Sequence, residues 1–312
     1  MPARLHYERV GQPNARRWLI MLHGILGSGG NWRTIARALT QRRSEWGVVL
    51  VDLRHHGKSD AGEPPHDLRA CAGDVLALAD ELGTLDAIAG HSFGGKVALA
   101  AREYARPGLL QTWVFDASPS AASDNPIDPT PHSLNGSAAH PGAAGVIDPT
   151  PHSLNGSAAH PGAAGIISTQ KPLYFVAQVV STLERLPRHW GHRNDFIDEV
   201  VKAGHARQLA QWLAMNLIQD GQGYGFRIDL AVIREMLADY YRRDLWSVLR
   251  SPTLPGSVEI VIAQQSAIVT AEDRVRLETA PAHVHVHTLD AGHWLHIDAP
   301  DAVVDLLAHT LD

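Results

Sequence analysis

Short runs of apolar residues recur along the chain, and stretches with helical spacing of apolar residues separate most of them. Six runs suit β-strands, namely Arg17–Leu22, Val48–Leu53, Leu85–Ala89, Thr112–Phe115, Val258–Ala263 and Val284–Leu289. Strands that are apolar on both faces are typical of parallel sheets buried between helices. The pattern therefore predicts an α/β fold with a mostly parallel, doubly wound sheet.

The segments between these runs suit crossover helices, over Trp32–Leu39, Leu68–Leu82, Gly95–Tyr104, Glu272–Thr279 and Ala302–Leu311. The alternation stops near Ser118 and resumes near Val258. Helical spacing continues in the later part of this gap, in Phe175–Leu186, Leu209–Leu217 and Leu230–Tyr241. We expect a core over 1–117 and 251–312, an irregular loop over 118–167 and a helical cap over 168–250. A cap inserted there covers the carboxyl edge of the strands, where open α/β sheets bind ligands.

A tandem repeat opens the gap. The segment Ile127–Gly145 recurs unchanged at Ile147–Gly165, and the repeat unit over 127–166 has no core-forming pattern. We interpret it as a duplication in a tolerant surface loop. The alternative is a metal site built from His132, His140, His152 and His160. However, the repeat has no helix or strand pattern that would hold these side chains in a fixed arrangement. No metal or other cofactor is expected.

The stretch Gly90-His91-Ser92-Phe93-Gly94-Gly95 lies between an expected strand and an expected helix. A serine hydroxyl needs a base to remove its proton, and a sharp G-x-S-x-G turn projects such a serine clear of the fold. Ser92 is therefore the predicted nucleophile. The alternative is a glycine-rich turn with an incidental serine.

Attack on an acyl carbon also needs donors for the oxyanion. The backbone N–H of Phe93, directly after the nucleophile, is one expected donor. The second should come from His23-Gly24-Ile25-Leu26-Gly27, which follows an expected strand. We expect the N–H of Ile25 to fill this role, with Leu26 as second choice.

The general base should be a histidine on the loop after the last strand. His293, in DAGHWLHIDAPD, has this position, and His296 is the competitor. Since His296 lies nearer the final helix, we expect it to support or line the site. For either residue the alternative is a hydrogen-bonded structural histidine.

These motifs resemble the α/β-hydrolase superfamily, and the likeness runs from Arg17 to Leu311 apart from the repeat. Asp52–Ser59 (DLRHHGKS) is similar to the D-x-R-x-H-G-x-S turn of that fold. HGILGS and LPRHW…FRIDL most resemble a small esterase branch of bacterial acyl esterases and their mitochondrial relatives. The resemblance implies an α/β-hydrolase fold with an inserted helical cap and an acyl ester as substrate.

In most of the superfamily the acid that orients the histidine follows the strand before the last one. This chain has Ser266 there, which cannot carry the charge, so either the triad is broken or the acid lies elsewhere. Asp116, at the end of TWVF, follows the strand after the nucleophile helix, as in the esterase branch, and is the predicted acid. Glu272 and Asp273 are the alternatives.

Three carboxylates also have alternative assignments. Asp290 lies three residues from His293 and would have to fold back on the same loop, whereas Asp52 precedes the serine and suits its own turn. Asp116 could instead cap the Ala-Ser-Pro turn that follows it.

These residues together predict a carboxylic-ester hydrolase that works through an acyl-enzyme on small to medium acyl esters. We expect the cap, which contains Trp190, Trp212, Tyr224 and Phe226, to shape an apolar acyl pocket. Since each of these aromatics is more often a core residue than a pocket residue, none is named as a binding residue. One alternative hypothesis is another reaction with the same residues, namely thioester, lactone or carbon–carbon hydrolysis, or perhydrolysis. Another is a non-catalytic ligand-binding protein on the same fold. Epoxide hydrolases and dehalogenases are disfavoured because those relatives have aspartate where Ser92 stands.

Composition and charge indicate which partners and which location the protein has. The 312 residues are 45% hydrophobic with a net charge of −6, and no Lys/Arg cluster favours nucleic acid as a partner. The apolar runs are too short to span a bilayer, and the first residues do not resemble a signal peptide. Cys71 is the only cysteine, so no internal disulfide is expected. These features favour a soluble cytoplasmic protein that binds a small-molecule ester, and they leave its oligomeric state open.

Overall fold

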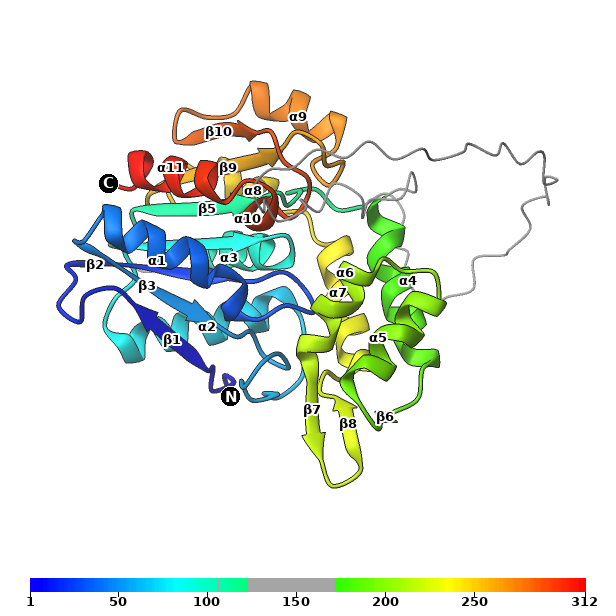
Figure 1. Cartoon of the computed structure of the whole chain (residues 1–312). Helices are drawn as coiled ribbons and strands as arrows, with labels where there is room; N and C mark the ends of the chain where they lie inside the picture. Colours follow the sequence, from blue (N-terminus) through cyan, green and yellow to red (C-terminus); the bar gives the residue numbers. More distant parts are fainter. Residues whose placement is uncertain (106, 123–171) are drawn as a thin grey trace, which may run out of the picture.

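A seven-stranded sheet forms the centre of the computed structural model, which describes residues 1–105, 107–122 and 172–312 (Figure 1). Its strand order is β1-β3-β2-β4-β5-β9-β10, and only the edge pair β1–β3 is antiparallel. The strands are β1 (Tyr7–Val10), β2 (Arg17–Leu22), β3 (Trp46–Val51), β4 (Ala87–His91), β5 (Gln111–Phe115), β9 (Ser257–Ala263) and β10 (Val284–Leu289). The mostly parallel sheet predicted from the sequence is confirmed.

Helices cover both faces of this sheet because its strands are apolar on both sides. Along β2, Leu19 and Met21 join one hydrophobic core, whereas Ile20 and Leu22 join the other. The first core packs under α1 (Arg33–Arg42) and α11 (Pro300–Thr310). The second packs under α2 (Leu68–Leu82), α3 (Phe93–Tyr104), α8 (Trp246–Arg250) and α9 (Ala271–Glu278). Figure 1 shows α1 and α11 together on one side of the sheet.

Among the described residues, the insertion between β5 and β9 contains, ahead of α8, four α-helices and a small antiparallel sheet. The helices are α4 (Pro172–Arg185), α5 (Arg193–Lys202), α6 (Arg207–Leu213) and α7 (Leu230–Arg242). The sheet has the order β6-β8-β7, from His189–Trp190, Gly223–Phe226 and Leu217–Asp220. The insertion is mainly helical, as predicted, and it also contains this small sheet, whose strands of two to four residues are too short to show an alternation in the sequence. In Figure 1 the insertion lies at one end of the central strands.

The tandem repeat, with the four histidines of the alternative metal site, lies outside the described residues. The positions of the domain boundaries stay predictions. Among the described residues, the helices are too short or too polar to cross a lipid bilayer. The cytoplasmic location likewise stays a prediction.

Candidate active site

Ser92 lies in a tight turn between β4 and α3. Its backbone has a φ of 54° and a ψ of −117°, which an L-residue rarely adopts. A Cβ on Gly90 would lie 1.9 Å from the carbonyl oxygen of Gly94, and one on Gly94 would lie 2.5 Å from that of His23. Both flanking positions therefore require glycine. The turn holds Ser92 at the amino end of α3 and the carboxyl end of β4, as the motif predicted.

The structure brings Ser92, His293 and Asp116 into one hydrogen-bonded chain. Nε2 of His293 lies 3.1 Å from Oγ of Ser92, and Nδ1 lies 2.7 Å from Oδ2 of Asp116. The side chain of His293 is 22% exposed, whereas that of Asp116 is fully buried. His293 lies on the loop between β10 and α10 (Leu295–Asp298). These contacts link a serine, a base and an acid. In the sequence the three residues follow one another in the order Ser92, Asp116 and His293.

Backbone bonds from β9 fix the position of Asp116. Its N–H donates to the carbonyl of Val261 (2.8 Å), and its Oδ1 accepts the N–H of Ala263 (3.2 Å). Its φ is 44°, so the chain turns sharply where β5 ends. The carboxylate therefore contacts β9 and His293, and the alternative role of capping the Ala-Ser-Pro turn is not observed.

Asp273 does not contact His293. This fully buried carboxylate instead accepts hydrogen bonds from the hydroxyls of Ser118 (2.6 Å) and Ser120, which lie just beyond Asp116. Ser266, at the position where most of the superfamily has its acid, accepts the N–H of Ile268 (3.2 Å) with its hydroxyl. Asp273 thus supports the loop that carries Asp116.

The other carboxylates also point elsewhere. Glu272 is exposed. Asp290 accepts a hydrogen bond from the amide of Gln265 (2.8 Å). Asp52 accepts the N–H groups of Gly29 and Lys58, so it fixes its own turn as expected.

Two backbone N–H groups are free to bind an oxyanion near Ser92. Phe93 is the first residue of α3, so its N–H has no intrahelical acceptor. The N–H of Leu26 donates to Nε2 of His56 (3.1 Å), whereas the N–H of Ile25 has no acceptor among the described residues. The side chain of His56 thus removes the second-choice donor and leaves the first. Ile25 and Phe93 stay the predicted pair.

Several imidazoles around this centre are held neutral by burial. Burial lowers the pKa of His23 to about 4 and that of His56 to about 3. It also lowers the pKa of His296 to about 4 and that of His91 well below its usual range. His296 lines the site without contacting Ser92, as expected. His91 was not singled out from the sequence, although its place directly before the nucleophile was a signal.

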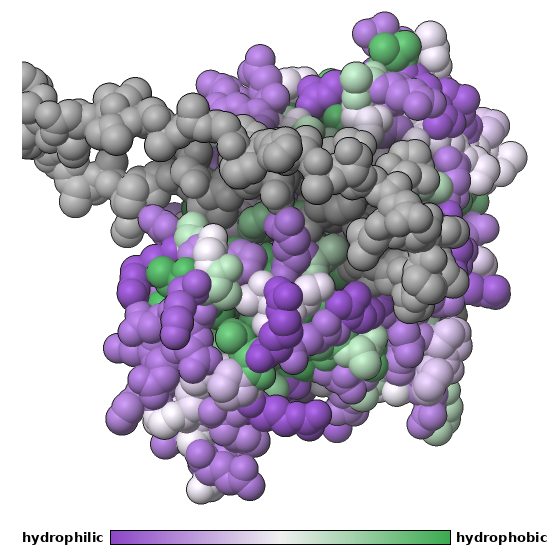
Figure 2. Space-filling view, turned by 90° about the vertical axis from the view of Figure 1, so that its right-hand side faces the viewer, coloured by the Kyte–Doolittle hydropathy of each residue, from purple (hydrophilic) through white to green (hydrophobic). Residues whose placement is uncertain are grey.

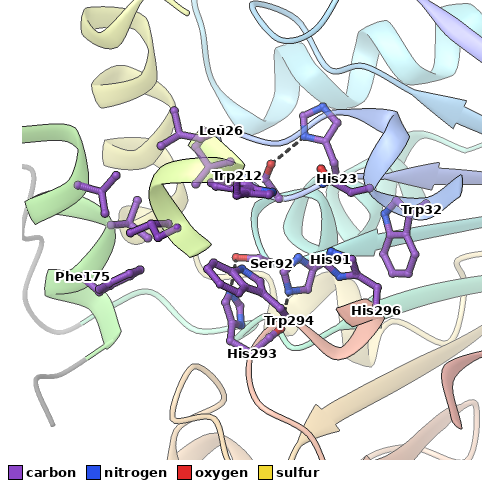
Figure 3. A pocket seen from close by; sticks show the side chains of 16 residues that line it. His23, Leu26, Trp32, His91, Ser92, Phe175, Trp212, His293, Trp294 and His296 are labelled. Carbon is purple, nitrogen blue, oxygen red and sulfur yellow. Dashed lines mark hydrogen bonds between the residues drawn. The ribbon is translucent and has the colours of Figure 1, made fainter. Parts of the chain in front are cut away.

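A pocket opens beside Ser92. Core loops and the insertion line it together, with His23, Gly24, Ile25, Leu26, Asn31, Trp32, His91, Ser92, Phe175, Val176, Val179, Leu209, Trp212, His293, Trp294 and His296 (Figure 3). Trp212 is in this lining, and the other three aromatics named from the cap are not. Trp190 and Phe226 instead pack on Phe196, at 4.9 and 5.9 Å between ring centroids.

The face that carries the insertion is mostly hydrophilic, and hydrophobic residues gather in its middle (Figure 2).

Within the described part of the chain, no group of three or more His, Cys, Asp or Glu side chains could hold a metal ion.

Comparison with known proteins identifies the family to which this chain belongs. Residues 19–306 match the model of the alpha/beta hydrolase family, so the chain belongs to that family. The predicted superfamily is confirmed.

Similar proteins include lipases and esterases. The sn-1-specific diacylglycerol lipase ABHD11 of Xenopus laevis is 28% identical over 290 residues, which cover 90% of this chain and 75% of the relative. The same lipase of Mus musculus is 24% identical over 317 residues, covering 98% and 86%. Among solved structures, a marine microorganism esterase has a TM-score of 0.73 at 18% identity and covers 99% of this chain and 100% of its own. At that identity the structural likeness shows the fold alone.

Proposed function

We propose that this protein is a serine-dependent carboxylic-ester hydrolase that works through an acyl-enzyme. The observation that carries the proposal is the chain of contacts from Ser92 through His293 to Asp116, at 3.1 and 2.7 Å. A nucleophile, a base and an orienting carboxylate in this order are what acyl transfer requires.

The contact with Asp116 sets the protonation of the base. Because a carboxylate only accepts, Nδ1 of His293 carries the proton, and Nε2 turns its lone pair to the hydroxyl of Ser92. His293 therefore takes the serine proton during attack and gives it to the leaving alcohol. The N–H groups of Ile25 and Phe93 stabilise the oxyanion. A water molecule activated by His293 then releases the acid, and no step requires a metal or an organic cofactor.

The substrate class follows from the lining and from the relatives. Phe175, Val176, Val179, Leu209 and Trp212 offer an apolar surface suited to a small or medium acyl chain. The activity of the ABHD11 relatives, which are diacylglycerol lipases, favours an oxygen ester. Thioester or lactone hydrolysis would use the same serine step, and a direct comparison of substrates separates these reactions.

Release of p-nitrophenol from acetate, butyrate, octanoate and palmitate esters tests the proposal. We expect turnover that Ser92→Ala abolishes and Ser266→Ala, a matched control at another buried serine, retains. The dependence of the rate on acyl chain length then shows how long a chain the apolar part of the pocket accepts. A folded wild-type protein that releases no more product than Ser92→Ala would contradict ester hydrolysis.

A further inference from the structure

One side chain of the insertion reaches the core loop Gly24–Gly27, which carries a predicted oxyanion donor. The side-chain amide of Asn216 donates to the backbone carbonyl of Leu26 at 2.9 Å, across 190 residues of sequence. Both residues are buried. The proposed mechanism uses the N–H of Ile25, which directly precedes Leu26, but it gives Asn216 no role. The hydrogen bond therefore joins the insertion to a part of the core that stabilises the transition state.

The direction of the Ile25 N–H is set by the carbonyl of Gly24. The two groups belong to one planar trans peptide, so they point in opposite directions. Two donors hold this carbonyl, the N–H of Gly27 at 3.0 Å and Nδ1 of His23 at 2.7 Å (Figure 3). Nδ1 carries the proton because Nε2 of His23 accepts the N–H of Leu53. While the Gly24 carbonyl stays with these donors, the N–H of Ile25 keeps its direction.

Asn216 controls one of these two donors. The carbonyl of Leu26 and the N–H of Gly27 also share one peptide plane, and Asn216 holds the carbonyl side of that plane. The amide of Asn216 is thus linked to the N–H of Ile25 through two peptide groups and the hydrogen bond between them. If the Leu26–Gly27 peptide rotates, the N–H of Gly27 leaves the carbonyl of Gly24.

The Leu26–Gly27 peptide needs such support because Leu26 is strained. Its φ is 62°, a left-handed conformation that a leucine rarely adopts. Conformations of this kind persist only where the surrounding groups fix them. Here Nε2 of His56 accepts the N–H of Leu26 at 3.1 Å, while Asn216 donates to its carbonyl. Loss of the Asn216 amide removes one of these two restraints and lets the peptide rotate toward a relaxed conformation.

The position of Asn216 depends on the fold of the insertion. Asn216 ends a short 3-10 helix directly before β7, and its carbonyl accepts the N–H of Arg227 at 2.9 Å, next to the pairing of β7 with β8. Among the described residues, three side chains bond to peptide groups of the Gly24–Gly27 loop, namely His23, His56 and Asn216. The two histidines come from the core, so Asn216 is the support that the insertion supplies.

From these contacts we propose that Asn216 is a positioning residue of the oxyanion hole. It holds the Leu26–Gly27 peptide so that the N–H of Ile25 points at the oxyanion, which makes transition-state stabilisation depend on the docked insertion. The insertion then contributes to kcat as well as to substrate binding. This inference rests on the proposed ester hydrolysis and adds a residue to it.

Asn216→Ala tests this role in the hydrolysis of p-nitrophenyl butyrate by the full-length protein. We expect kcat to fall about 10- to 100-fold, less than the roughly 10²–10³-fold that loss of a whole oxyanion donor costs. KM should change less than about threefold, because the oxyanion forms only in the transition state and Asn216 is not in the lining of the pocket beside Ser92. Asn194→Ala, the same change at an exposed asparagine of α5, should keep the wild-type kcat.

Inhibition by 1,1,1-trifluoropentan-2-one separates a displaced oxyanion donor from general damage. This ketone has the propyl group of a butyrate ester. Oγ of Ser92 bonds to its carbonyl carbon, the serine proton passes to His293, and the carbonyl oxygen becomes an oxyanion in the oxyanion hole. The inhibition constant Ki should rise in Asn216→Ala by about the factor by which kcat/KM falls. Inactive or unfolded protein lowers the concentration of active sites and leaves Ki unchanged.

Three results would overturn the proposal. These are a kcat of Asn216→Ala within about threefold of the wild type, a KM that rises while kcat stays unchanged, and a kcat that falls while Ki stays unchanged. Asn216→Leu, with a side chain of similar size and no N–H, gives the same comparison if the alanine variant does not fold. Failure of the proposed function looks different, because the wild type itself would then show neither turnover nor ketone binding that depends on Ser92.

Discussion

Replacing Asp116 by asparagine isolates its role in orienting His293. The N–H of Ala263 donates to Oδ1 of Asp116, so an asparagine keeps its oxygen there and turns its NH₂ toward His293. Nδ1 of His293 must then accept, which moves the ring proton to Nε2, the atom that faces Ser92. The imidazole can no longer take the proton of the serine.

The expected loss in kcat is about 10⁴-fold, close to that of a serine protease triad with the same change, or roughly 5 kcal/mol in the activation barrier. The assay is p-nitrophenyl butyrate turnover, with circular dichroism and urea unfolding to show that the fold is retained. Asp273→Asn is the control, since this carboxylate contacts Ser118 and Ser120 and not His293. We expect it to lower kcat less than tenfold. Normal turnover in Asp116→Asn with a collapse in Asp273→Asn would refute the assignment.

Three further substitutions, at Gly94, Lys96 and Glu259, test contacts inside the core. For each one, urea unfolding measures the change in the free energy of unfolding. Gly94→Ala should cost about 1–3 kcal/mol because its Cβ meets two backbone carbonyls, whereas Gly73→Ala, with nothing within 4 Å, should gain up to about 1 kcal/mol. Lys96→Met should cost about 3 kcal/mol, since the buried ammonium donates to three carbonyls at 2.7–2.8 Å, and a loss under 1 kcal/mol would contradict this. Burial raises the pKa of Glu259, but hydrogen bonds from two histidines of β10 and a serine outweigh it and lower the pKa. The stability advantage of the wild type over Glu259→Gln should therefore hold above pH 4.5 and shrink as pH falls below it, and an advantage independent of pH would exclude this linkage.

Continuous apolar runs made most of the central sheet predictable. β2 and β10 begin and end at the predicted residues, because each is bounded by polar or turn residues. The edge strand β1 was missed, since YERV is half exposed and lacks an apolar run. The hairpin of β7 and β8 was missed for a similar reason: Leu217 continues the helical spacing of α6, while the chain already turns into a strand.

The site shows the same division between local and long-range information. Ser92 and His293 could be predicted because each is marked by neighbours within a few residues. The choice between Asp116 and Asp273 depends on which carboxylate meets His293 across 177 residues of sequence, which spacing alone does not determine. The choice between Ile25 and Leu26 depends on His56, which binds one N–H and leaves the other.

Labelling with a fluorophosphonate probe, followed by mass spectrometry of the digested protein, tests whether Ser92 is the nucleophile. We expect covalent attachment at Ser92, with ester hydrolysis lost in proportion to the labelled fraction. Hydrolysis that persists in folded protein after complete labelling of Ser92, or a Ser92 that stays unlabelled while turnover continues, would contradict a nucleophilic role for this serine.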